Sequence, residues 1–85
     1  MSYAIEFEPK AARQLARIPQ PDRRRIIARI ELLGDEPRPN GVEKLEGFTN
    51  LYRVRQGNYR IVYSIDDGLR IVTIARIGQR GSVYR

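Results

Sequence analysis

The sequence contains no cysteine and no histidine. Without cysteine the chain can form no disulfide, and it has no thiol to serve as a nucleophile or a zinc ligand. Without histidine it lacks the side chain that most often transfers protons near neutral pH. An enzyme with this composition would have to depend mainly on positioning and electrostatics. The absence of cysteine also fits a reducing compartment, and we expect a cytoplasmic protein.

Long apolar runs are also missing. The first residues, MSYAIEFEPK, lack the apolar stretch and the basic start of a signal peptide, so we expect none. No stretch approaches the length needed to span a bilayer, and we expect no membrane partner. With 85 residues, the chain is long enough for one domain, which we expect to cover residues 1–85.

Positive charge, by contrast, is abundant. Lysine and arginine number 16 against 10 acidic residues, which gives a formal net charge of +6. All but Lys10 and Lys44 of these basic residues are arginines. Arginine binds phosphate through a planar fork and keeps its charge in almost any setting. This balance favours a polyanionic partner, nucleic acid first, although a merely basic soluble protein would show it too.

Two helices are expected after a first strand. Residues 3–7 alternate as a strand does, and Pro9 then opens a helix at a position that proline tolerates. The expected apolar stripe of this helix is Ala12, Leu15, Ala16 and Ile18. A second helix is expected over residues 21–33, with Gly34 as its stop. Its expected apolar stripe is Ile26, Ile27, Ile30 and Leu33.

Strands dominate the second half of the chain. Residues 44–47 indicate a short edge strand, and alternating stretches follow at 51–56, 59–65 and 69–77. Gly57-Asn58 and Asp67-Gly68 supply two-residue turns between them. This order predicts an α+β domain, in which an N-terminal strand and two helices accompany a small, mainly antiparallel sheet. Both helices are expected on one face of that sheet.

The first hairpin decides which side chains share a face of the sheet. With Gly57-Asn58 as the turn, Arg55 lies opposite Arg60, and Arg53 lies opposite Val62. The expected helix-covered face carries Tyr52, Val54, Ile61, Tyr63 and Ile65. The expected solvent-open face carries Arg53, Arg55, Arg60, Val62 and Ser64.

The second hairpin extends both faces. A turn at Asp67-Gly68 predicts three cross-strand pairs, namely Ile65 with Arg70, Tyr63 with Val72 and Ile61 with Ile74. The same register predicts a mixed set on the open face, namely Ile71, Thr73, Ala75 and Ile77.

Placing Arg55 opposite Arg60 is unfavourable. Like charges in such a pair cost a few tenths of a kcal/mol, up to about 1. The fold does not need this repulsion, because Thr or Gln at either position would avoid it. A bound phosphate would reverse its sign by accepting charge-assisted hydrogen bonds from both guanidinium groups. The alternative is that these are solvated strand arginines whose alkyl stems cover the sheet.

The C-terminal residues, IGQRGSVYR, present Arg80 on a bend and Tyr84 on a short tail. Tyr84 could cap the core or stack on a base. Together with the segments YAIEFEP, KLEG and YRVRQGNYRIVYSI and the two amphipathic helices, this ending resembles the RelE family of bacterial toxins. That family lies within the wider RelE/ParE superfamily, and the resemblance covers nearly the whole chain.

The resemblance implies a toxin of a type II toxin–antitoxin system that enters the ribosomal A site and cuts messenger RNA. It implies a cognate RelB-like antitoxin as partner and, by analogy, operator DNA bound by the toxin–antitoxin complex. The family's basic catalytic positions fall on Arg53, Arg55, Arg60 and Arg80, and its functional tyrosine falls on Tyr84. Well-known members carry lysine where this chain has Arg53 and Arg55, and arginine cannot readily give up its proton. The segment between Arg80 and Tyr84 is also shorter here.

We expect a metal-independent endoribonuclease without a cofactor, in which the ribose 2′-hydroxyl attacks the adjacent phosphate. Arg60 would clamp that phosphate, while Arg53 and Arg55 would stabilise charge and grip the RNA backbone. Arg80 would stabilise the transition state or the leaving oxygen. Tyr84 would stack on a base to orient the 2′-hydroxyl, or shuttle its proton.

Two other functions stay open. A ParE-like toxin would inhibit DNA gyrase and cut nothing, and it requires neither the arginines of the open face nor Tyr84. A non-catalytic nucleic-acid-binding module would show salt-sensitive binding to many sequences. The acidic residues show no metal-ligand spacing. Glu46 could approach the basic face as a base, although a glutamate on an edge strand is normally just solvated.

Overall fold

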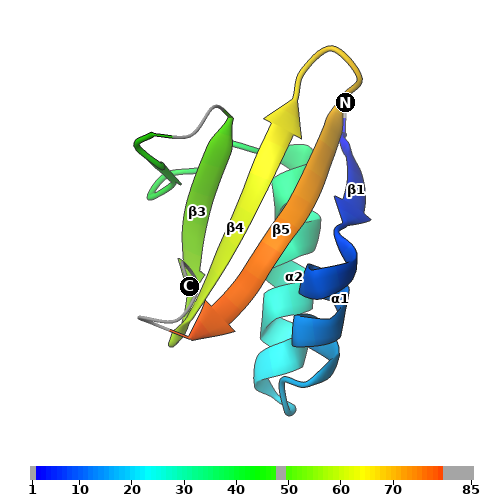
Figure 1. Cartoon of the computed structure of the whole chain (residues 1–85), viewed down its shortest axis with the longest axis vertical. Helices are drawn as coiled ribbons and strands as arrows, with labels where there is room; N and C mark the ends of the chain where they lie inside the picture. The colour runs from blue at the N-terminus through cyan, green and yellow to red at the C-terminus, as the bar shows by residue number, and fades with distance from the viewer. Residues whose placement is uncertain (1, 48–49, 80–85) are drawn as a thin grey trace.

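The computed structural model describes residues 2–47 and 50–79, and it places one strand and two helices before four strands (Figure 1). The elements are β1 (Ala4–Phe7), α1 (Pro9–Ala16), α2 (Asp22–Asp35), β2 (Glu43–Lys44), β3 (Leu51–Gln56), β4 (Tyr59–Asp66) and β5 (Ile71–Gln79). The strands form one sheet in the order β1-β5-β4-β3-β2. Only the pairing of β1 with β5 is parallel. The expected α+β fold with a mainly antiparallel sheet is therefore confirmed.

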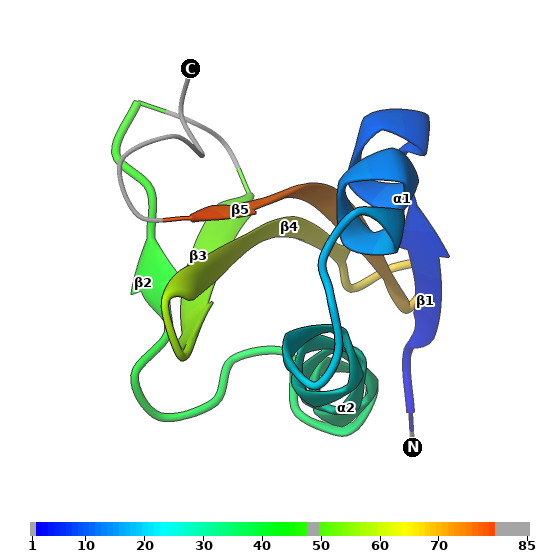
Figure 2. The ribbon, with the colours of Figure 1, turned by 90° about the horizontal axis from the view of Figure 1, so that it is seen from below.

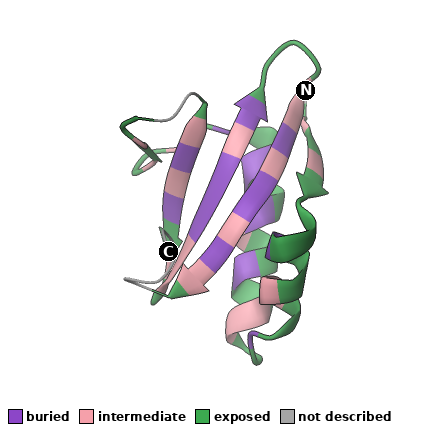
Figure 3. Cartoon of the chain, viewed as in Figure 1, coloured by how far each residue is buried: buried purple, intermediate pink, exposed green. Residues whose placement is uncertain are grey.

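Both helices lie on the same side of the sheet (Figures 1 and 2). Ile26, Ile30 and Leu33 of α2 belong to one buried cluster with the apolar face of the sheet. That face contributes Tyr52, Val54, Ile61, Tyr63, Ile65 and Val72, each at most 8% exposed. Burial of each large aliphatic side chain stabilises the fold by roughly 1.5–3 kcal/mol. The predicted helix-covered face is confirmed, and Figure 3 shows buried positions of this face alternating with less buried ones along β3.

The apolar stripes of the helices differ in part from the prediction. In α1 the buried position is Ala11, whereas Ala12 and Ala16 are exposed. In α2, Ile27 is 39% exposed. These three residues instead line a shallow surface hollow together with Phe7, Leu15 and Arg23. Helical spacing alone left the rotation of each helix undecided, because neighbouring apolar positions offered two possible stripes.

Gly34 is not the stop of the second helix. The helix continues to Asp35, and Gly34 is buried within it. The N–H of Tyr3 donates a hydrogen bond of 2.6 Å to the Gly34 carbonyl. A Cβ at position 34 would lie 3.1 Å from the carbonyl oxygen of Tyr3 and 3.4 Å from Cδ1 of Ile5. Glycine therefore lets the N-terminal segment approach the helix closely.

The first hairpin has the predicted register throughout. Arg55 pairs with Arg60, and Arg53 pairs with Val62. Gly57 adopts the left-handed φ of +61° that the tight turn requires. The edge strand β2 begins one residue earlier than expected and pairs Glu43 with Arg53.

The second hairpin is longer than predicted. The turn spans residues 67–70, and Asp66 Oδ1 accepts a hydrogen bond of 2.8 Å from the Leu69 N–H. Arg70 has a left-handed φ of +58°, and its carbonyl accepts the N–H of Ala4. The predicted register was therefore wrong by two residues, since Val72 lies opposite Ile65 and not Tyr63. A shift of two residues keeps each side chain on its face.

A β-bulge then changes the faces of β5. Tyr63 pairs with Ile74, but the next residue back along β4, Val62, pairs with Arg76, which leaves Ala75 as the extra residue. The prediction that Ile77 lies on the open face was wrong, because Ile77 pairs with Ile61 in the core and is 2% exposed. Arg76 takes a place on the open face instead.

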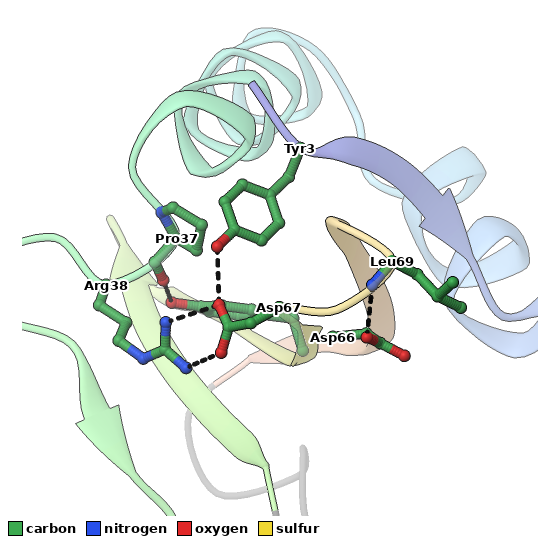
Figure 4. Close-up of polar contacts among 7 residues, drawn as sticks. Tyr3, Pro37, Arg38, Asp66, Asp67 and Leu69 are labelled. Atoms are coloured by element: carbon green, nitrogen blue, oxygen red, sulfur yellow. Dashed lines mark hydrogen bonds and ion pairs between the residues drawn. The ribbon is translucent and has the colours of Figure 1, made fainter. Parts of the chain in front are cut away.

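A polar cluster ties together three segments at the far end of the sheet from the β3–β4 turn (Figure 4). Arg38 donates two hydrogen bonds to the Asp67 carboxylate, at 3.2 and 3.0 Å, and Tyr3 Oη donates a third at 2.6 Å. We call Tyr3, Arg38 and Asp67 the Arg38 cluster. Beside it, Tyr63 Oη donates to the carbonyl of Pro37 at 2.6 Å. These contacts fix the loop after α2 and the N-terminal segment to the sheet.

Within the described part of the chain, neither helix has the length and apolarity to cross a membrane.

Candidate functional site

Four arginines lie on the side of the sheet opposite the helices. They are Arg53 and Arg55 of β3, Arg60 of β4 and Arg76 of β5. We call these four residues the arginine face. The pairing places them in two rows across the sheet, because Val62 lies between Arg53 and Arg76, and Arg60 lies directly opposite Arg55. Within residues 2–47 and 50–79, no helix packs on this side.

Arg55 and Arg60 form the like-charged pair that the sequence predicts. The Arg55 side chain is 63% exposed, whereas Arg60 is half-buried. The Arg60 Nε is shielded from solvent and donates to no acceptor among the described residues. Together with the turn residues 57–59, the two arginines line a shallow hollow of about 220 Å³. An anion in this hollow would receive charge-assisted hydrogen bonds from both sides.

Arg53 differs from its neighbours because it already contacts a carboxylate. Its Nη2 donates to Glu43 Oε1 at 2.6 Å, and its side chain is only 15% exposed. The expectation that Arg53 would be open to solvent was therefore wrong. Arg55 Nη2 lies 4.0 Å from the same oxygen. The hydrogen bond from Arg53, followed by the charges of Arg53, Arg55 and Arg60, lowers the pKa of Glu43.

Two members of the site were missed by sequence reasoning. The first is Glu43, because the expected edge strand began at residue 44 and drew attention to Glu46. In the described part of the chain Glu43 is the carboxylate that contacts the arginine face, and Glu46 has no ion pair there. The second is Arg76, which only the bulge moves to this face. A pairing of β2 that extended one residue further would have found Glu43, but no sequence signal marked the bulge.

Arg80 and Tyr84 lie outside the described residues. The end of β5 is described, and it pairs Gly78 with Arg60 and Gln79 with Tyr59. Among the residues that the structure describes, no three acidic side chains gather as a metal site would require.

Comparisons with known proteins agree with this fold. Residues 5–84 match the family model described as ParE toxin of type II toxin–antitoxin system, parDE. The toxin RelG of Mycobacterium tuberculosis is 32% identical over 90 residues, which cover 100% of this chain and 99% of RelG. The toxin RelE of the same organism is 33% identical over 87 residues, covering 98% of this chain and 87% of that one.

A solved structure gives the same result in three dimensions. The archaeal RelE–RelB complex from Pyrococcus horikoshii contains a chain that superposes with a TM-score of 0.83 at 31% identity. The match covers 98% of this chain and 100% of that chain. Family, relatives and fold coincide, and the chain belongs to the RelE family of toxins of type II toxin–antitoxin systems.

Proposed function

We propose that this toxin is an endoribonuclease that cuts messenger RNA in the ribosomal A site. The observation that carries the proposal is the set of guanidinium groups on the side of the sheet opposite the helices, with Arg55 directly opposite Arg60. A fold gains nothing from this repulsion, whereas a ribose-phosphate chain would be bound by it. The chain's membership of the RelE family supports the same reading.

The proposed reaction is an internal transfer on the RNA. The 2′-oxygen forms a bond to the adjacent phosphorus, and the bond from phosphorus to the 5′-oxygen breaks. The 2′-hydroxyl loses its proton and the 5′-oxygen gains one, which leaves a 2′,3′-cyclic phosphate and a 5′-hydroxyl. Negative charge grows on the non-bridging oxygens, and donors already placed around them lower the barrier.

The arginines have distinct parts in this scheme. Arg60 clamps the phosphate, because its Nε donates to no acceptor in the described part of the chain. Arg55 stabilises the same charge from across the turn. Arg53 grips the backbone once phosphate competes with Glu43 for its fork. Arg80 acts on the transition state or the leaving oxygen, and Tyr84 stacks on a base or carries the 2′-hydroxyl proton.

Proton transfer is the weak point of such a site. Arginine keeps its proton, and the chain has no histidine. A site of this kind gains most from a substrate that is already strained and oriented, as messenger RNA is on the ribosome. We therefore expect slow cutting of free RNA and fast cutting of ribosome-bound RNA.

The proposed protein partner is a RelB-like antitoxin. The match to a chain of an archaeal RelE–RelB complex motivates this proposal. The antitoxin would bring acidic and apolar residues that cover the arginine face or displace the C-terminal tail. The two proteins together would bind their own operator DNA, and the toxin would act in the cytoplasm.

Mapping RNA ends after induction of the toxin tests the proposal. New ends should lie within coding regions and in frame, and they should vanish with Arg60→Ala or Arg80→Ala while the variants stay folded. Full toxicity of both variants at normal expression would remove the enzymatic claim. A uniform scatter of ends, unrelated to reading frame, would remove the ribosome from it.

A ParE-like gyrase inhibitor is the second candidate, and the family model that matches the chain favours it. It predicts inhibition of supercoiling by purified gyrase and no new RNA ends. A non-catalytic nucleic-acid-binding module predicts neither of these effects, and its expression should not stop growth. Running the supercoiling and messenger-cleavage assays side by side separates all three functions.

A further inference from the structure

β5 contributes an arginine, Arg76, to the site. Simple alternation along the strand would assign Arg76 to the helix-covered face. Arg76 pairs with Val62, which in turn pairs with Arg53. Directly opposed residues share a face of a sheet, so the two arginines flank Val62 on the arginine face. The side chain of Arg76 is half-buried there.

The bulge that places Arg76 is held by a side chain from α1. After the extra residue Ala75, the N–H of Ile77 donates to Gln14 Oε1 at 2.8 Å. Ile77 can then enter the core while Arg76 points the other way. Bulges are frequent next to active sites, where they redirect a side chain. Here the bulge allows one strand to supply an apolar residue to the core and a cation to the open face.

Arg76 also lacks a counter-charge. Its Nη1 donates to the carbonyl of the preceding residue, Ala75, at 3.1 Å. No carboxylate lies within 4.0 Å of it in the described part of the chain. A guanidinium has five N–H donors, so several of them are left for a ligand.

We infer that Arg76 binds a backbone phosphate of the RNA and extends the site from the β3–β4 hairpin onto β5. This inference rests on the proposed function. Neighbouring strands are about 4.8 Å apart, so the Cα atoms of Arg53 and Arg76 are separated by roughly 10 Å. Arg60 lies on the intervening strand, nearer the turn. The RNA therefore crosses the strands and does not run along the hairpin.

The test measures binding separately from cutting. The probe is a short fluorescent single-stranded RNA with a 2′-O-methyl group on each ribose, so that no 2′-hydroxyl can attack and the cyclisation step is blocked. Arg76→Gln should raise its Kd about tenfold and reduce the slope of log K against log salt by about 0.7. Arg76→Lys should keep the slope and recover part of the affinity, because it keeps the charge but not the fork.

The matched control is Arg24→Gln. Arg24 is an exposed arginine of α2, on the helix side of the molecule, and its loss changes the net charge equally. We expect its Kd to change about twofold or less, because solvent and salt screen a distant charge. Thermal unfolding of each variant shows that the comparison is between folded proteins.

The outcomes separate this inference from the proposed function. If the wild type cuts messenger RNA on ribosomes, but Arg76→Gln and Arg24→Gln have the same Kd and the same salt slope, the role of Arg76 is overturned. The proposed function then stands. If Arg76→Gln loses RNA affinity but the wild type cuts no messenger RNA, the role of Arg76 in RNA binding is supported. The proposed nuclease activity is then overturned. The inference is overturned if Arg76→Gln weakens antitoxin binding and leaves RNA binding unchanged. It is also overturned if the wild type binds no RNA.

Discussion

Arginine side chains have opposite environments in the Arg38 cluster and on the arginine face. Arg38 is paired through both ends of its fork with Asp67, and its guanidinium lies 5.3 Å from the ring centre of Tyr52. Arg60 has no such partner, and Arg55 lies opposite it on the next strand. The first arrangement satisfies the donors within the chain. The second leaves them available for a ligand.

Exposure to solvent does not explain this difference. The Arg38 side chain is 42% exposed and could be solvated without a partner, yet it is paired. Arg60 is half-buried, with a shielded Nε, and it is not. An unsatisfied buried donor costs about 1–3 kcal/mol, which is a large share of the stability of a small domain. Natural proteins tolerate local features that oppose stability chiefly where function needs them.

Replacing Arg60 should have a larger effect than any of the other substitutions considered below. Arg60→Gln should lower the rate of messenger cleavage on ribosomes about a hundredfold or more, because it removes a donor aimed at developing charge. Its unfolding temperature should stay the same or rise slightly, because the change also removes the repulsion with Arg55. Arg38→Gln carries the same charge change in the Arg38 cluster, and it should lower the unfolding temperature and leave cleavage near the wild-type rate. If Arg38→Gln removed cleavage and kept full stability, the division between the two regions would be wrong.

The next effect concerns the hydrogen bond beside the Arg38 cluster. Burial raises the pKa of Tyr63, so its hydroxyl stays neutral and donates to the Pro37 carbonyl. Tyr63→Phe should lower the free energy of unfolding by about 1–2 kcal/mol, because a buried carbonyl loses its donor. Urea unfolding measures this change. RNA affinity should stay at the wild-type value, and a loss of affinity similar to that of Arg60→Gln would contradict the separation of the regions.

The two hairpins also differ in how well their turn residues predict the strand register. Gly57-Asn58 fixed the register of the first one, because a two-residue turn between alternating strands leaves little choice. The second turn contained an equally good signal at Asp67-Gly68, yet Asp66 caps a longer turn and Arg70 adopts a left-handed conformation. Local turn chemistry therefore identified the strands but not the second register.

Long-range contacts account for the other errors. The bulge in β5 depends on Gln14, which is 63 residues away in sequence, and the need for glycine at position 34 depends on the N-terminal segment. Neither contact leaves a pattern in the neighbouring residues. The three hairpin arginines of the site could be predicted because one short segment contains them, whereas Glu43 required the exact start of β2 and Arg76 required the bulge in β5.

Replacing Arg55 should have a smaller effect, a gain in stability. Arg55→Thr removes the like-charged pair with Arg60 and should raise the free energy of unfolding by a few tenths of a kcal/mol, up to about 1. The gain should shrink at high salt, because salt screens the repulsion. Arg25→Thr is the control. Arg25 Nη1 lies 3.8 Å from Asp22 Oδ1, so this substitution removes no like-charged pair. Equal stabilisation by both changes would point to a general effect of net charge.

The smallest effect is a pH dependence from the Arg38 cluster. The hydrogen bonds from Arg38 and then Tyr3 lower the pKa of Asp67 below its usual value. A carboxyl group with a lowered pKa in the folded state stabilises the protein above its unfolded pKa, and this contribution is lost as the pH falls through the folded value. From about pH 4 downward, the wild type should therefore lose more stability than Asp67→Asn does. Urea unfolding at a series of pH values measures the difference, and parallel curves for the two proteins would show that Asp67 gains nothing from its partners. The contribution should be small because the Asp67 side chain is 57% exposed and surface ion pairs are weak.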